Sequence, residues 1–115
     1  STNDQHVLIE TDKSKMTVVI DEIPEGGELI VGDMTGNGYC DLAVPYGKSD
    51  VNESYTLLLH DSTRDELIES NIDIITNPEF KGQKIISSYR DAARWHEETF
   101  CYSENRNDFF ICEKK

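Results

Sequence analysis

Residues 98–113 read ETFCYSENRNDFFICE, and this stretch decides the fold class. Its two ends are rich in Phe, Tyr, Thr and Ile, which favour β-strands. Its centre, residues 104–108, contains Asn and Asp, whose side chains stabilise turns by bonding to the nearby backbone. Two strand-like segments joined by such a turn predict a β-hairpin.

Two of the three cysteines, Cys101 and Cys112, flank this turn. Three cysteines allow three different single disulfides, or none. If the turn is symmetric about residues 106–107, Cys101 lies directly opposite Cys112, close enough for a disulfide. We therefore expect a Cys101–Cys112 disulfide, which implies an oxidising compartment such as the periplasm or the cell exterior. The alternative is a pair of reduced cysteines in a cytosolic hairpin.

Strand-like segments also recur at short spacing along the rest of the chain. They lie at 6–10, 16–20, 28–32, 40–44, 54–60, 71–76, 83–89, 95–103 and 108–113. Turn signals rich in Gly, Pro and Asn separate them, at 24–27, 36–38, 45–47, 77–78 and 81–82. This pattern predicts a single all-β domain over residues 1–115, built as an antiparallel β-sandwich or meander. For residues 63–70 we expect either one helical turn or a loop.

The charge of the chain is strongly acidic, with 23 Asp and Glu against 11 Lys and Arg and a formal net charge of -12. Such a field repels nucleic acids and anionic membranes and attracts a basic protein. The alternative is that acidity only keeps a secreted protein soluble. No apolar run approaches the roughly 18 residues that indicate a membrane-spanning helix. The sequence thus favours a periplasmic or secreted domain with a protein partner.

Residues 33–41 read DMTGNGYCD, which matches the D-x-[DNT]-G-[DN]-G-x-x-D pattern of a calcium loop. Ca²⁺ binds about six to eight hard oxygen ligands. A tight loop places alternate residues on one concave side, and Gly38 permits the sharp turn that this requires. The predicted metal ligands are the side chains of Asp33, Thr35, Asn37 and Asp41 and the backbone carbonyl of Tyr39.

The surroundings of this loop are strand-like, so the sequence predicts a calcium loop inside a β-hairpin. Val44 occupies position 12, where helix–loop–helix sites carry a bidentate glutamate. Only two of the predicted ligands are carboxylates, and low ligand charge predicts low affinity. Position 8 of such loops points into the core, which would make Cys40 a small buried hydrophobe. The alternative is a metal-free turn rich in Asn, Asp and Gly.

The order of features from residue 28 onward resembles a group of small bacterial periplasmic proteins. The features are the calcium block at 30–44, the strand at 55–59, Asn-Pro-Glu-Phe at 77–80, the segment 85–93, and Trp95 before the last hairpin. The first block resembles the FG-GAP-type calcium loop. The whole series resembles immunity proteins that act against lysozyme-like toxins delivered by secretion systems. These are similar to inhibitors of invertebrate-type lysozyme, which carry a Ser-Gly-x-x-Tyr inhibitory loop.

The resemblance implies a domain that binds and inhibits a peptidoglycan hydrolase effector. It directs attention to Ser87–Asp91, although this segment lacks the glycine of the inhibitory motif. Ile85 and Ile86 indicate the end of a strand, so we expect residues 87–91 to form a loop on a rigid base. Tyr, Trp and Arg dominate interface hot spots, and an arginine suits a cleft built around two acidic residues. The predicted partner-binding residues are Ser87, Ser88, Tyr89, Arg90, Asp91 and Trp95.

The sequence gives little support to an enzyme. The three histidines are scattered, and there is no zinc spacing, nucleophile elbow, phosphate loop or dinucleotide fingerprint. Glu97 and Glu98 are adjacent, so on a strand they fall on opposite faces, and we interpret them as a solvated strand face. We therefore predict no catalytic residues. The second hypothesis is a calcium-stabilised extracellular adhesion or carbohydrate-binding module, which exposed aromatic platforms would favour.

Overall fold

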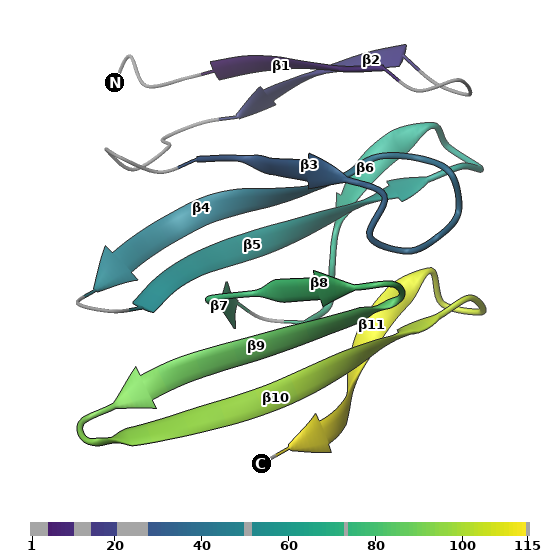
Figure 1. Ribbon diagram of the computed structural model, residues 1–115. Coiled ribbons are helices and arrows are strands. Elements are labelled where there is room, and N and C mark those ends of the chain that lie inside the picture. The colour runs from purple at the N-terminus through teal and green to yellow at the C-terminus, as the bar shows by residue number, and fades with distance from the viewer. Residues whose placement is uncertain (1–4, 11–14, 21–27, 50–51, 73, 115) are drawn as a thin grey trace.

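The computed structural model describes residues 5–10, 15–20, 28–49, 52–72 and 74–114, and the predicted turn at 24–27 lies outside them. The prediction of an all-β fold is confirmed, because every regular element among these residues is a strand (Figure 1). The strands are β1 (Gln5–Glu10), β2 (Lys15–Ile20), β3 (Ile30–Gly32), β4 (Asp41–Ser49), β5 (Asn52–Asp61), β6 (Glu66–Glu69), β7 (Ile75–Thr76), β8 (Glu79–Lys81), β9 (Lys84–Asp91), β10 (Arg94–Ser103) and β11 (Asp108–Lys114).

The strands form three antiparallel sheets in which neighbours along the chain pair with each other. Strands β1 and β2 form a hairpin, β3-β4-β5-β6 form the second sheet with β7 also paired to β5, and β11-β10-β9-β8 form the third. Short connections between strands favour this arrangement, because a two- to five-residue turn can join only antiparallel neighbours. The predicted meander is therefore the arrangement within each of the two larger sheets.

The main core combines one face of each of the two larger sheets. Along β5, Tyr55, Leu57 and Leu59 are buried, as expected when alternate residues of a strand point to the same face. Their partners come from the third sheet and include Ile85 and Phe100. Burying a side chain of this size contributes about 1.5–3 kcal/mol, so these residues hold the two sheets together.

The opposite face of the second sheet carries a separate apolar cluster. Leu42 is fully buried there, and partly buried residues pack around it. They are Leu29, Cys40, Val44, Leu58 and Leu67. Both faces of β4 and β5 are therefore apolar, which explains the run Leu57-Leu58-Leu59 in a strand.

A short bridge between β6 and β8 connects the two larger sheets. Strand β7 pairs with β5, with Ile75 opposite Tyr55. The backbone N–H of Thr76 donates to the Ser87 hydroxyl of β9 at 2.9 Å, and that hydroxyl donates to the Thr76 carbonyl at 3.2 Å. A serine in the middle of β9 thus completes the backbone hydrogen bonding of a strand that belongs to another sheet.

Residues 63–70 form neither a helical turn nor a loop throughout. A turn at 62–65 is followed by β6, which pairs with β5 so that Leu67 lies opposite His60. The sequence expectation was wrong because four residues with weak local preference gain their stability from pairing with β5. Leu67 also packs against the Leu42 cluster.

The last hairpin has the predicted strands and the predicted disulfide, but not the predicted register. Cys101 and Cys112 are bonded, with their Cα atoms 5.8 Å apart. Cys101 lies opposite Phe110, because the turn is centred on residues 105–106 and not on 106–107; further along, the register shifts between Thr99 and Phe100. This irregularity leaves Cys112 without a direct partner in the ladder, and the disulfide runs diagonally across the hairpin. The pairing is confirmed, and the expectation that the two cysteines lie directly opposite is wrong.

Candidate functional site

The loop at residues 33–41 is closed by its own polar side chains. The two carboxylate oxygens of Asp33 accept hydrogen bonds from the backbone N–H groups of Gly36 and Gly38, at 2.8 and 2.9 Å. The Asn37 side chain accepts one from the backbone N–H of Tyr39 at 2.9 Å. Gly36 and Gly38 have φ values of 83° and 88°, which favour glycine. The predicted tight turn is therefore present, with Asp33 and Asn37 on its inner side.

Asp41 closes the loop from the core side. It is fully buried, and its two carboxylate oxygens accept backbone N–H groups of Met34 and His60, at 2.9 and 2.8 Å. Burial raises the pKa of the Asp41 carboxyl to about 6, and these hydrogen bonds offset part of that rise. Asp41 therefore ties the loop to β5, because His60 belongs to that strand.

The loop is also supported from the third sheet. The Gln83 side chain donates a 2.6 Å hydrogen bond to the carbonyl of Thr35, which is fully buried. Tyr39 stacks on His60 with ring centroids 4.2 Å apart, and the His60 Nε2 lies 2.8 Å from Asp65. These contacts attach the loop to both of the larger sheets.

The loop contains the oxygen atoms of the predicted calcium site, and the carboxylate oxygens among them accept backbone hydrogen bonds. Its predicted ligands are hard oxygen atoms, and two of them, on Asp33 and Asp41, belong to carboxylates. Among the described residues no group of three or more His, Cys, Asp and Glu side chains could hold a metal ion. Any ion here would thus depend on neutral oxygens of Thr35, Asn37 and Tyr39 as well.

Cys40 is the free cysteine among the described residues, and it is only partly buried. It packs against the Leu42 cluster, so the prediction of a fully buried residue is corrected to one at the edge of that cluster. Burial is the main cause that raises the pKa of its thiol, and the nearby Asp41 and Asp33 add to the rise. The thiol therefore stays protonated at neutral pH, which makes it a poor nucleophile.

The predicted partner-binding segment is a strand, not a loop. Residues 87–91 continue β9 up to Asp91, and the turn that follows consists of Ala92 and Ala93 alone. The strand predicted at 83–89 is confirmed and continues to Asp91, so the loop expected after Ile86 is wrong. Pairing with β10 and the bonds from Ser87 to Thr76 favour the extended conformation instead.

Strand geometry divides the predicted partner-binding residues between two faces. Trp95 lies opposite Arg90 and Glu97 lies opposite Ser88, on the outer face of the third sheet. Ser87 and Tyr89 lie on the inner face, where Ser87 is buried and the ring of Tyr89 stacks on His96. On the outer face Trp95 is 59% exposed. The six predicted residues therefore belong to one hairpin end, but they do not form one surface.

The hairpin end is anchored to the neighbouring sheet through two asparagines. The Asn52 side chain accepts the backbone N–H of Arg90 at 2.9 Å and donates to the Arg90 carbonyl at 3.0 Å. The Asn77 side chain donates to the Ser88 carbonyl at 3.0 Å and accepts the backbone N–H of Glu53. These residues were missed by sequence reasoning, since no local pattern indicates a bond between residues 38 positions apart.

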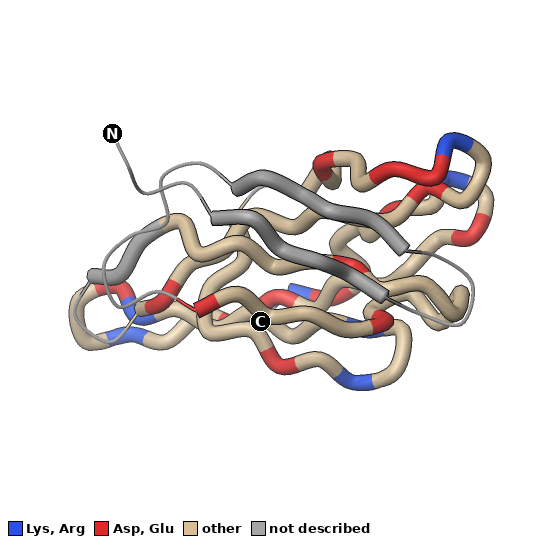
Figure 2. Tube along the Cα trace, turned by 90° about the horizontal axis from the view of Figure 1, so that it is seen from above, with Lys and Arg blue, Asp and Glu red and all other residues tan. Residues whose placement is uncertain are grey.

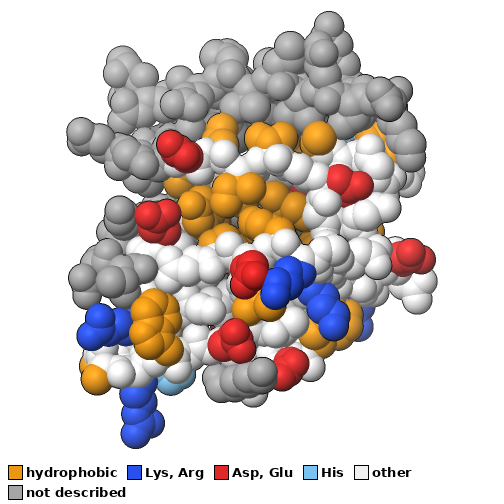
Figure 3. Space-filling view, in the orientation of Figure 1, with side chains coloured by type: hydrophobic (Ala, Val, Ile, Leu, Met, Phe, Trp, Pro, Cys, Tyr) orange, Lys and Arg blue, Asp and Glu red, His pale blue; other side chains and the backbone are white. Residues whose placement is uncertain are grey.

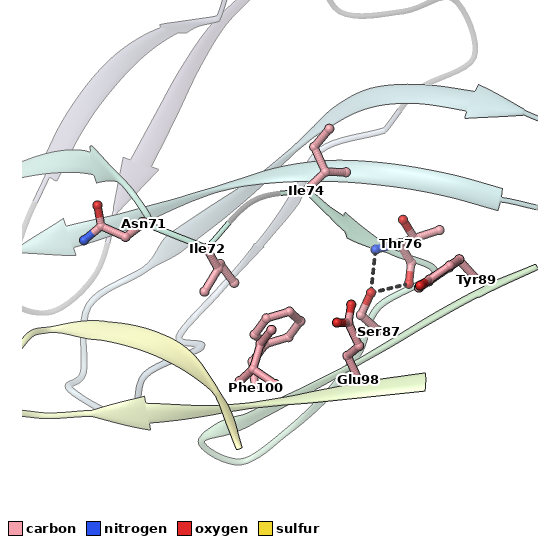
Figure 4. A pocket seen from close by; sticks show the side chains of 9 residues that line it. Asn71, Ile72, Ile74, Thr76, Ser87, Tyr89, Glu98 and Phe100 are labelled. Atoms are coloured by element: carbon pink, nitrogen blue, oxygen red, sulfur yellow. Dashed lines mark hydrogen bonds between the residues drawn. The ribbon is translucent and has the colours of Figure 1, made fainter. Parts of the chain in front are cut away.

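A pocket of about 610 Å³ opens on the inner face beside this hairpin (Figure 4). Its wall on one side comes from Asn71, Ile72, Ile74 and Thr76, and on the other from β9, β10 and β11. In Figure 4 the Glu98 carboxylate lies next to Ser87, while Ile72 and Phe100 lie beyond it. Glu98 was interpreted as a solvated residue, but its side chain is only 20% exposed. The sequence signal for this partial burial is Phe100, a core residue two positions further along the same strand and therefore on the same face as Glu98.

The hairpin end and the 33–41 loop lie at opposite ends of the molecule. In Figure 1 the turn between β9 and β10 lies at the left, and the loop between β3 and β4 lies at the right. The contacts of the two segments agree with this, because the loop contacts Gln83 in the turn just before β9, whereas Asn52 contacts Arg90 near the end of β9. The two candidate sites are therefore separate.

The described surface mixes charges and apolar side chains. Figure 2 shows acidic positions spread over the described chain, with basic positions among them. On the face shown in Figure 3, hydrophobic side chains gather in the middle and charged side chains lie around them. No helix in the described ranges is long and apolar enough to cross a membrane. The disulfide is compatible with an extracellular or periplasmic location.

Comparison with protein-family models, with curated protein sequences and with solved structures found no match for this chain.

Proposed function

We propose that this chain is a periplasmic immunity protein, and that it binds and inhibits a lysozyme-like peptidoglycan hydrolase through the end of the β9–β10 hairpin. The observation that carries this proposal is the pairing of Trp95 with Arg90 on an exposed, anchored hairpin. Large exposed apolar side chains on a rigid base favour a protein interface over an empty surface.

The shape and chemistry of the hairpin end suit insertion into a cleft. Arg90 is exposed, and its Nε donates to the Ala92 carbonyl at 2.8 Å, which holds the guanidinium beside the turn. A glycan-hydrolase cleft contains a pair of carboxylic acids, and a guanidinium binds such groups with charge-assisted hydrogen bonds. Trp95 opposite it adds apolar area that would be buried against the wall of the cleft.

The net charge supports the same kind of partner. Enzymes that act on the anionic cell wall are expected to be basic, and a chain of net charge -12 attracts a basic protein. Such attraction raises the rate of association more than it raises the final affinity.

Calcium has a structural role in this proposal. The 33–41 loop would hold one Ca²⁺ through Asp33, Thr35, Asn37 and Asp41 and the Tyr39 carbonyl. The ion would neutralise two carboxylates and strengthen the link between the loop and β5. The backbone N–H of His60, in β5, already donates to Asp41. Because the loop lies away from the hairpin end, the ion is expected to stabilise the fold without contacting the partner.

The test is a double substitution on the outer face, Arg90→Ala with Trp95→Ala. Both side chains are exposed, so the variant should fold, which its circular dichroism spectrum checks. Binding to purified lysozyme-like hydrolases, with an invertebrate-type lysozyme among them, should fall by at least about tenfold. The matched control is Arg106→Ala, an exposed arginine on the β10–β11 turn, which should bind as the parent does. Equal binding by the double variant and the parent would remove the outer face from the proposal.

A carbohydrate-binding module remains the second candidate, favoured by the exposed aromatic rings of Trp95 and Tyr46. Such rings stack on sugars in many binding modules. Calorimetric titration with soluble peptidoglycan fragments separates the two proposals. Heat of binding that disappears in Trp95→Ala, without any bound hydrolase, would favour the module.

A further inference from the structure

Glu98 is the acidic residue among the described residues that line the inner-face pocket. Strand β10 places Glu98 opposite Ser87 and two residues before the core residue Phe100. Its carboxylate therefore stands at the border between the buried core and solvent. A carboxylate in such a position interacts more strongly with a cation than one on an open surface does.

The chain itself shows a cation near this carboxylate. The Nζ of Lys114 lies 3.9 Å from a Glu98 oxygen, while the Lys114 side chain is 71% exposed. An exposed ion pair at this separation contributes little to stability, so an incoming cation can displace Lys114 at small cost. Lys114 is thus a counter-ion of Glu98 that does not line the pocket.

The walls beside Glu98 are aliphatic. Ile72 and Ile74 lie on one side and Ile111 on the other, and Ile74 and Ile111 are 37% and 51% exposed. Exposed aliphatic walls that end at a carboxylate suit the stem and charged head of a lysine or arginine. Ser87 and Tyr89 also line the pocket, and the Ser87 hydroxyl there is bonded to the backbone of Thr76.

We propose that this pocket receives a lysine or arginine side chain from an extended segment of the protein partner, with Glu98 as its counter-ion. The proposal rests on the proposed function in one respect, namely that the partner is a basic protein. A volume of about 610 Å³ exceeds one side chain, so neighbouring residues of the segment enter as well. The hairpin would then contact its partner on both faces, Trp95 on the outer one and Glu98 on the inner one.

The first test uses a short peptide and no hydrolase. The probe is a blocked pentapeptide, Leu-Leu-Lys-Leu-Leu, compared with the same peptide carrying norleucine in place of lysine. In ¹⁵N–¹H correlation spectra the lysine peptide should shift the amide signals of Ile72, Ile74 and Glu98, and the norleucine peptide should bind about tenfold more weakly. Shifts that lie elsewhere, equal binding of both peptides, or no shifts at millimolar peptide would overturn the proposal.

Two matched variants isolate the carboxylate. Glu98→Gln keeps the shape of the side chain and should lower the affinity for the lysine peptide about tenfold, leaving that for the norleucine peptide unchanged. Glu97→Gln makes the same change on the outer face of the same strand and should leave both affinities unchanged. If Glu97→Gln weakens binding as much as Glu98→Gln does, net charge and not the pocket binds the peptide.

The same variants separate this proposal from the proposed function. A hydrolase that binds the parent and Glu98→Gln equally, but not Arg90→Ala with Trp95→Ala, overturns the pocket proposal alone. Glu98-dependent peptide binding without inhibition of any hydrolase overturns the proposed function and leaves the pocket as a site for another basic protein.

Discussion

The side-chain amide of Asn52 pairs with the backbone of Arg90 through two hydrogen bonds, 2.9 and 3.0 Å long. Asn52 begins β5 and Arg90 lies near the end of β9, so this pair joins the two larger sheets at the hairpin end. The asparagine acts here as a short piece of additional strand, because it offers one donor and one acceptor to one residue. The candidate binding hairpin is therefore held from outside its own sheet.

Replacing Asn52 should loosen the hairpin end. Asn52→Ala removes both hydrogen bonds, and because the site is exposed we expect a loss of about 1 kcal/mol in the free energy of unfolding. Hydrogen exchange of the Arg90 amide should become faster, since that N–H loses its acceptor. The control is Asn105→Ala on the exposed β10–β11 turn. Unchanged protection of the Arg90 amide in Asn52→Ala would show that the pair does not hold the hairpin.

Calcium should raise the melting temperature of the domain. An ion that binds only the folded state stabilises it by about 2.7 kcal/mol when its concentration is 100 times the dissociation constant. Asp33→Ala should abolish the response to calcium, whereas Glu79→Gln, on an exposed strand at another site, should keep it. Differential scanning calorimetry in millimolar calcium and in chelator measures both. Identical melting curves of the parent in the two buffers would rule out the calcium site.

In chelator, the stability of the domain should fall as pH rises through the titration of Asp41. Its pKa of about 6 in the folded state lies above the ordinary value of 3.8, so the folded state holds this proton more tightly than the unfolded state does. The contribution is complete below pH 3.8 and is lost as pH rises through about 6. It amounts to roughly 3 kcal/mol.

Urea unfolding of the parent and of Asp41→Asn between pH 4 and pH 7 measures this contribution. The variant should show a smaller loss of stability over that range, because its amide does not titrate. An asparagine side chain has one oxygen acceptor in place of the two that Met34 and His60 use. The variant should therefore be less stable than the parent at every pH. Parallel pH curves for the two proteins would contradict the assignment to Asp41.

The Cys101–Cys112 disulfide should stabilise the last hairpin. It links residues 11 positions apart, for which the loop-entropy account gives about 3 kcal/mol. Cys101→Ser with Cys112→Ser should lose this amount in urea unfolding, and Cys40→Ser should lose less than about 1 kcal/mol because Cys40 is unpaired. Mass spectrometry of a non-reduced digest checks the pairing. A peptide that joins Cys40 to either partner would refute it.

Features determined by neighbouring residues were predictable from the sequence. The 98–113 hairpin and the 33–41 turn follow from local composition, because strand-forming residues flank Asn, Asp and Gly in each. The cysteine pairing followed as well, since Cys101 and Cys112 lie on the two strands of this one hairpin. The shift between Thr99 and Phe100 was not predictable, because no residue there marks a bulge.

Features that depend on distant contacts were not predictable. The strand predicted at 83–89 continues to Asp91, because its pairing with β10 and the bonds of Ser87 to Thr76 favour the extended conformation there. The anchoring by Asn52 and the pocket around Glu98 join segments far apart in the chain. The alternation of residues along β10 predicts that Glu98 shares a face with Phe100. It does not predict which residues of other segments face Glu98.

The measurement that tests the account most directly is the inhibition of peptidoglycan hydrolysis. Purified domain is titrated against lysozyme-like hydrolases, including an invertebrate-type lysozyme, and the rate is followed at several concentrations of soluble peptidoglycan. The account predicts stoichiometric inhibition that added substrate relieves, because the β9–β10 hairpin occupies the cleft, and it predicts a much weaker effect from Arg90→Ala with Trp95→Ala. Full hydrolytic activity at a molar excess of the folded domain, or inhibition that substrate does not relieve, would contradict it.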